Sequence, residues 1–74
     1  MTLIEKAEYL TQTKGKISLT FKSGEILTGF SRGIFEKEND DGDYIGDEIL
    51  FDSNQLEFPL FVMDQDLVAV EVAN

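Results

Sequence analysis

The spacing of the apolar residues changes at Lys16, and this change constrains the fold more than any other feature of the chain. In residues 3–13 apolar side chains recur three or four positions apart, as on one face of a helix. In residues 16–22 apolar and polar side chains alternate, as in a strand with one buried face. The sequence therefore predicts a short amphipathic helix followed by strands.

Both ends of the predicted helix, residues 3–13, carry termination signals. Thr2 and Glu5 fit a capping box, in which each side chain accepts from the backbone amide of the other residue. Lys14 suits the negative end of the helix dipole, and Gly15 can adopt the left-handed cap. A helix of this length is marginal alone, so we expect its apolar stripe to pack on the strands.

Turn-forming residues divide the rest of the chain into strands. Gly29 and Gly33 fall inside the second strand, where glycines mark bulges or sharp bends. Pro59 restricts the fourth strand to an edge or an interrupted start. With 74 residues, the chain has room for one domain, residues 1–74. The predicted strands are residues 16–22, 26–36, 47–52, 56–63 and 67–72.

This order of elements, one helix and then five strongly bent antiparallel strands, is the plan of a mainly β small barrel of the Src-homology-3-like kind. Residues 21–29 add a local motif: apolar Phe21, glycine three residues on, an apolar residue three further, and Gly29 two later. This motif resembles the opening of the first signature of the Sm-like (LSm-type) family. The resemblance implies an Sm-like barrel and ring-like or edge-to-edge assembly.

The resemblance does not extend to the residues with which the Sm-like family holds RNA. The family has an Asp in its first signature, and in this chain that position falls near Phe35. Asn39 falls near the family's Asn only if the acidic loop is aligned without a gap. Where the second signature has Arg-Gly after an apolar strand, this chain has Asp64-Gln65. We therefore expect the fold without the RNA ligand.

Charge is distributed unevenly along the chain, which has a net charge of −9. All six cations lie at or before Lys37, and residues 38–74 hold eleven acids and no base. A mostly negative surface repels nucleic acid and anionic membranes and attracts cations or basic proteins. Lys16, Lys22 and Arg32 flank Phe21 and Phe30 as on a nucleic-acid platform, but both rings fall in phase with core residues, so we expect them to be buried. We assign no nucleic-acid-binding residue.

The acidic loop, residues 39–48, suggests a divalent-cation site. Set against the EF-hand pattern, Gly42 takes the sixth position and Glu48 the twelfth, but Lys37 stands where the first aspartate is required. A looser site would use Asp41, Asp43 and Glu48. The alternative is a solvated loop whose like charges keep it soluble. The lysine at the first EF-hand position, Lys37, favours this alternative.

The side chains that enzymes use for catalysis are scarce. The chain has no histidine and no cysteine, and its acid pairs lie in polar, turn-forming sequence that gives no apolar pocket to raise a carboxyl pKa. No glycine-rich loop precedes a helix, as phosphate binding would require. We therefore expect no catalytic residue, no enzyme activity and no cofactor.

The most apolar stretch, residues 58–63, does not alternate as a strand with one buried face would. It is covered on both faces by its own domain or by another chain, and small cores often depend on self-association. We expect a homo-oligomer, a protein-interaction or assembly module, with weak cation binding or divergent RNA binding as alternatives. Acids stand near the N-terminus where a signal peptide has a basic region, so we expect a cytoplasmic protein. The predicted self-association residues are Phe58, Leu60, Phe61 and Val62.

Overall fold

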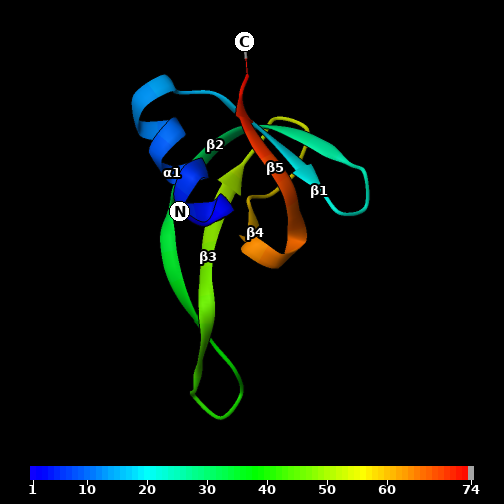
Figure 1. The fold of residues 1–74 in the computed structure, drawn as a ribbon. Helices are drawn as coiled ribbons and strands as arrows, with labels where there is room; N and C mark the ends of the chain where they lie inside the picture. Colours follow the sequence, from blue (N-terminus) through cyan, green and yellow to red (C-terminus); the bar gives the residue numbers. More distant parts are fainter. Residues whose placement is uncertain (74) are drawn as a thin grey trace.

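The computed structural model describes residues 1–73, which form one N-terminal helix and a five-stranded antiparallel sheet (Figure 1). The protein is thus mainly β with an N-terminal helix, as the sequence predicts. The elements are α1 (Leu3–Lys14), β1 (Ile17–Phe21), β2 (Ile26–Glu38), β3 (Tyr44–Asp52), β4 (Leu60–Met63), a 3-10 helix (Asp64–Asp66) and β5 (Leu67–Val72).

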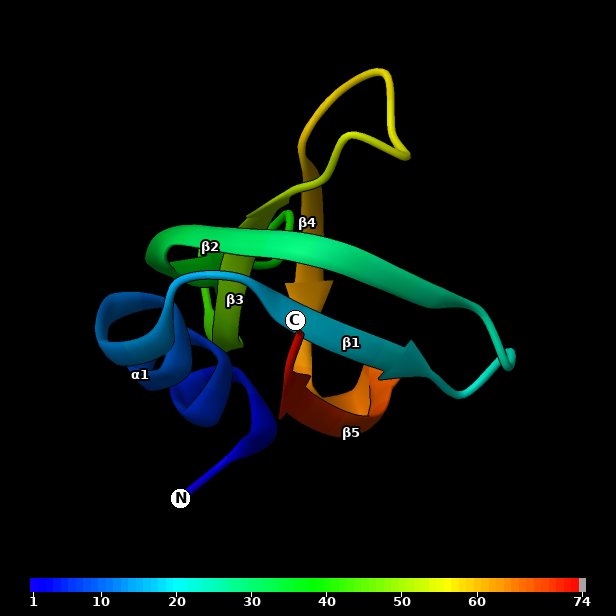
Figure 2. The same ribbon diagram turned by 90° about the horizontal axis from the view of Figure 1, so that it is seen from above.

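The sheet has the strand order β4-β3-β2-β1-β5 and is not closed into a barrel, which corrects the predicted barrel. The long strand β2 joins two parts of the sheet: its first part pairs with β1, and its second part pairs with β3. β3 and β4 run across the direction of β1 (Figure 2). β4 has only four residues, and the 3-10 helix that follows it carries the chain back to β1. Consequently β4 and β5 remain the two edges.

Strand limits differ most from the predictions on the two sides of β3. β2 ends at Glu38 and β3 begins at Tyr44, so the predicted acidic loop is mostly a β-hairpin with a tip at residues 39–43. Asn39 Oδ1 accepts from the backbone amides of Asp41 and Asp43, and Gly42 adopts a φ of 85°. These local bonds close the tip early. β4 begins only after Pro59, and it lies at the edge of the sheet where proline restricts it.

Helix α1 has the expected capping box: Thr2 Oγ1 accepts from the Glu5 amide, and Glu5 Oε1 accepts from the Thr2 amide. At its other end the Gly15 amide donates to the carbonyls of Leu10 and Thr11. A third contact is not visible in the sequence. Asp64 Oδ1 accepts from the amides of Leu3 (2.5 Å) and Ile4 (3.3 Å), so the 3-10 helix caps α1 from the far end of the chain.

Two glycines shape the bend of β2. At Gly29 the strand passes so close to Asp52 that a β-carbon would overlap the Asp52 carbonyl oxygen. At Gly33, φ is 136°, and the register with β3 shifts between Ser31 and Ile34. A register shift of this kind is a bulge, and it increases the local twist. The bulge separates the part of β2 that covers the core from the part that projects as a hairpin.

The core lies between the two parts of the sheet and is closed by α1. Ser31, the innermost polar residue of β2, ties the helix to the sheet: its hydroxyl donates to Glu8 Oε2, and its amide donates to Thr11 Oγ1. The buried apolar residues come from every strand and from α1. They are Ile4, Ala7, Ile17, Leu19, Leu27, Ile49, Phe51, Val62, Leu67 and Val70.

Candidate functional site

The outer edge of β4 is the most apolar exposed surface that the sequence predicted to be functional. β4 pairs with β3 on one side, from Leu60↔Phe51 to Met63↔Glu48. Among residues 1–73, no strand pairs with its other side. Phe58, Leu60 and Phe61, here called the edge patch, expose 73%, 39% and 54% of their surface. Three large apolar side chains therefore face solvent beside unpaired backbone groups.

Val62, the fourth residue predicted for self-association, lies elsewhere. Its side chain is fully buried in the core, so only its backbone belongs to the edge. Strand geometry explains the difference, because neighbouring residues point to opposite faces. Val62 points inward and Phe61 outward. β4 therefore buries Val62, whereas Leu60 and Phe61, which point to opposite faces, both stay partly exposed.

Phe35 extends the edge patch onto β2. Its ring packs edge-on against Phe61, with 6.2 Å between ring centroids and an interplanar angle of 86°. Phe35 is itself 46% exposed. The sequence pattern does not indicate Phe35 as part of this surface, since the bulge at Gly33 reverses the alternation that places side chains inside or outside. In the sequence, only the glycine at position 33 inside the strand indicates that such a bulge could occur.

A groove of about 370 Å³ runs beside the edge patch, where a closed barrel would have its β4–β5 seam. Phe21, at the end of β1, is one of its lining residues. The other lining residues are Lys22, Ser23, Leu60, Phe61, Gln65 and Asp66. Lys22 and Asp66 give the groove one charge of each sign, and its other walls are polar or apolar.

The residues of the candidate cation site are not brought together. Asp41 and Asp43 lie in the hairpin tip, whereas Glu48 lies in β3, largely buried, with Oε2 3.7 Å from Lys37 Nζ. Within residues 1–73, no three His, Cys, Asp or Glu side chains are grouped so that they could hold a metal ion. Cation binding by Asp41, Asp43 and Glu48 stays a prediction, and it would require the tip to rearrange.

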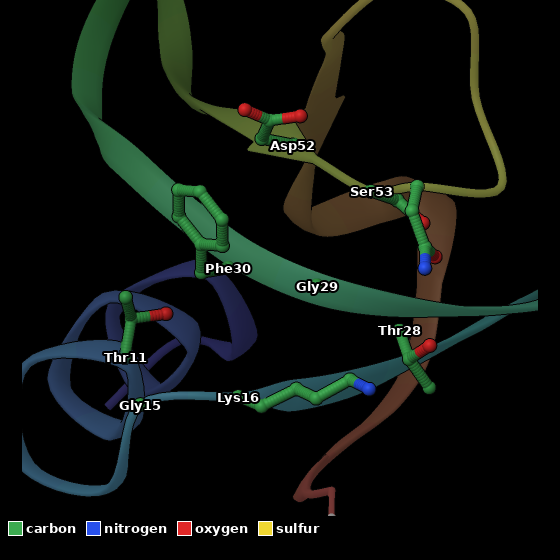
Figure 3. Close-up of a pocket in the computed structure, with 9 residues that line it drawn as sticks. Thr11, Gly15, Lys16, Thr28, Gly29, Phe30, Asp52 and Ser53 are labelled. Atoms are coloured by element: carbon green, nitrogen blue, oxygen red, sulfur yellow. The ribbon is translucent and has the colours of Figure 1, made fainter.

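Phe30 is 46% exposed, so the expectation that it is buried is wrong. The buried positions of β2 are Leu27, Gly29 and Ser31, and Phe30 points away from them. Phe30 lines a groove of about 630 Å³ with Lys16 on one side and Asp52 on the other (Figure 3). Asp52 also holds Arg32, at 3.3 Å. Exposure of Phe30 removes one argument against nucleic-acid binding, but the net charge of −9 still opposes it.

Comparison with known protein families, curated proteins and solved structures finds no match for this chain. In residues 1–73 no helix has the length and apolar character needed to cross a membrane.

Proposed function

We propose that this protein is a non-enzymatic assembly module of the cytoplasm that associates with further copies of itself through the β4 edge. The observation that carries the proposal is the edge patch beside an unpaired strand. Natural edge strands are usually protected by charged residues, by bulges or by a covering element. β4 has the sequence Leu-Phe-Val-Met and carries no charge. Its shortness and the preceding Pro59 limit edge pairing, but they leave Phe58, Leu60 and Phe61 exposed, and a further copy would cover these side chains.

The strand order supports one geometry of association. Each chain has two open edges, β4 and β5, among its described residues. If β4 of one copy pairs with β5 of the next, the contact is heterologous and produces a closed ring or a filament. β5 offers exposed Val68 and Val72 for such a contact, at 59% and 43% exposure. The resemblance of residues 21–29 to the Sm-like signature also supports ring-like assembly.

Light scattering after gel filtration tests the proposal. At micromolar concentration the protein should elute as a dimer or a larger ring, because a sheet continued across chains buries the edge patch. Phe61→Glu should shift it to monomer, since a carboxylate in a closed contact loses hydration without gaining a partner. Tyr9→Glu is the matched control: it replaces an aromatic residue of similar exposure, 56%, on α1. A wild-type monomer contradicts the proposal.

A mixing experiment distinguishes the two possible partners of β4. In the heterologous arrangement Val68→Glu also yields monomers, because it blocks the β5 edge. An equimolar mixture of the Phe61→Glu and Val68→Glu variants should then form a dimer that cannot grow, through the one intact β4 and the one intact β5. If Val68→Glu leaves assembly unchanged, β4 pairs with β4 of another copy instead, and the heterologous arrangement is wrong.

A further inference from the structure

Besides the edges of β4 and β5, part of β3 has an unpaired outer side, next to the part of β3 that β4 covers. β3 runs from Tyr44 to Asp52, but β4 covers its outer side only from Glu48 onward. From Tyr44 to Asp47 the strand pairs with β2 on its inner side. No strand of residues 1–73 pairs with its outer side, which borders a groove of about 350 Å³. Ile4 and Met63 are among the lining residues of this groove.

One face of this edge is acidic. Asp47 lies opposite Glu36 on β2, and Tyr44 Oη donates to Asp47 Oδ1 at 2.8 Å. This hydrogen bond, with smaller contributions from burial and from the charges of Asp47 and Glu36, raises the pKa of Tyr44. Neither carboxylate has a cation within 4 Å in the described chain, because the nearby Lys37 is held by Glu48.

The other face of the edge carries Gly46 and Met63, and beyond them the ion pair between Lys37, opposite Gly46 on β2, and Glu48. Gly46 has no side chain and a φ of 137°. Its surface is covered by Met63, whose Cε would lie 3.1 Å from a β-carbon at this position. Ile45, the extra residue of the bulge opposite Lys37 and Glu38, is 48% exposed and lines the same groove. A strand that paired here would thus meet the unpaired carboxylates of Asp47 and Glu36 on one face. On the other face its nearest neighbours would be Gly46 and Met63, since the charges of Lys37 and Glu48 are already paired with each other.

We propose that the Tyr44–Asp47 edge binds an extended segment of another protein in which basic and apolar side chains alternate. Addition of a strand to an open edge uses main-chain hydrogen bonds for affinity and alternate side chains for specificity. The alternation would place cations against Asp47 and Glu36 and apolar groups against Gly46 and Met63. The cations of this chain that lie in or next to a strand belong to β1 (Lys16 and Lys22) and β2 (Arg32 and Lys37), and both strands are already paired on two sides. A folded second copy therefore offers no free strand of this kind, and the proposed ligand is a different chain.

An amide-shift titration of the full chain tests the proposal. The probe is a capped synthetic peptide of about ten residues that alternates lysine and valine, which is long enough for one strand. We expect saturable shifts confined to the amides of Ile45, Gly46 and Asp47 and their immediate neighbours. A peptide that alternates glutamate and valine should cause none. Shifts spread over all acidic segments, or absent, overturn the proposal.

Charge reversal distinguishes this edge from general attraction to an acidic protein. Asp47→Lys should weaken binding of the lysine–valine peptide about tenfold, as one exposed attraction becomes a repulsion. Asp41→Lys makes the same charge change in the hairpin tip and should weaken it less than about threefold, because salt screens distant charges. Equal losses in both variants mean diffuse attraction and overturn the proposal. If Asp47→Lys does not fold, the nearly isosteric Asp47→Asn is compared with Asp41→Asn, which makes the same charge change in the tip.

Discussion

The two parts of β2 have nearly opposite surroundings, although they belong to one continuous strand. The first part, up to Ser31, alternates strictly and buries Leu27, Gly29 and Ser31. It pairs with β1 as far as Gly29 and with β3 at Phe30 and Ser31. The part after the bulge, paired with β3 from Ile34 to Glu38, forms a hairpin arm, residues 34–48, that projects from the body of the molecule (Figure 1). Ile34 and Phe35 in the arm stay 39% and 46% exposed.

The two parts of β2 show that a segment can be fully paired in a sheet without burying its side chains. Both parts of β2 are fully strand-like, but only the first has a second layer to pack on. The arm depends on cross-strand pairs and on the Asn39 turn, each of which contributes a fraction of a kcal/mol to about 1 kcal/mol. We therefore expect the arm to tolerate changes that the body does not, and the surfaces available for partners to lie on the arm and at the edges.

The largest expected difference between body and arm concerns two glycines. Gly29→Ala should cost about 3 kcal/mol or more, because the added methyl meets the backbone of Asp52, which cannot rotate away. Gly42→Ala, in the arm, should cost about 1 kcal/mol, since it meets open space and only its φ of 85° is unfavourable. Urea unfolding of both variants measures the two costs, and equal costs would remove the distinction between the regions.

An intermediate effect is expected from two aspartates, one in each region. Asp64→Ala should cost about 1–2 kcal/mol, because the amides of Leu3 and Ile4 lose their acceptor at the start of α1. Asp41→Ala in the hairpin tip should change stability by less than about 0.5 kcal/mol, as expected for an exposed loop residue.

Asp64→Asn refines this test, since it keeps one acceptor oxygen and should lose less than Asp64→Ala. Thermal unfolding followed by circular dichroism measures all three variants. If Asp64→Ala and Asp41→Ala lose equally little, the contact between the 3-10 helix and α1 does not stabilise the body.

The smallest effect concerns pH and is confined to the arm. The hydrogen bond to Asp47 raises the pKa of Tyr44, so the folded chain holds this proton more tightly than the unfolded chain does. The resulting stabilisation is complete below about pH 10, the ordinary phenol pKa, and is lost as the pH rises through the raised value. In Asp47→Asn the Tyr44 pKa should fall, because the carboxylate acceptor and its charge are gone.

Ring resonances of Tyr44, followed through an alkaline titration, measure this pKa in both proteins. Hydrogen exchange of core amides such as that of Phe51 serves as the control and should not change as Tyr44 ionises. Parallel loss of protection in the arm and the core would mean that the two regions open as one unit.

Much of the local structure could be predicted from the sequence, because its causes are close in the chain. The capping box of Thr2 and Glu5 forms as expected, and the helix ends before Gly15. Gly15 has a positive φ of 89°, but its ψ of −98° differs from the expected left-handed cap. The fifth strand spans residues 67–72 in both the prediction and the structure. The hairpin tip could not be placed as well, since the Asn39 side chain closes the turn before the acidic run ends.

The candidate sites depended on more distant relations and were only partly predictable. Phe58, Leu60 and Phe61 are exposed beside an open edge, but Val62 belongs to the core. Phe30 is exposed because Leu27, Gly29 and Ser31 occupy the buried face of β2, and Phe35 is exposed beyond the bulge, where the register with β3 has shifted. The open edge of Tyr44–Asp47 follows from the shortness of β4, and no pattern in residues 44–47 indicates it.

The sequence alone determined the helix with its ends, the succession of short strands and the restriction of the strand after Pro59 to an edge. These follow from periodicity, capping and proline geometry, which act over a few residues. The tertiary structure decided that the sheet stays open, that Asp64 caps a helix at the other end of the chain, and which aromatic rings face solvent. These depend on strand pairing and register between distant segments, where a single bulge exchanges the buried and exposed faces.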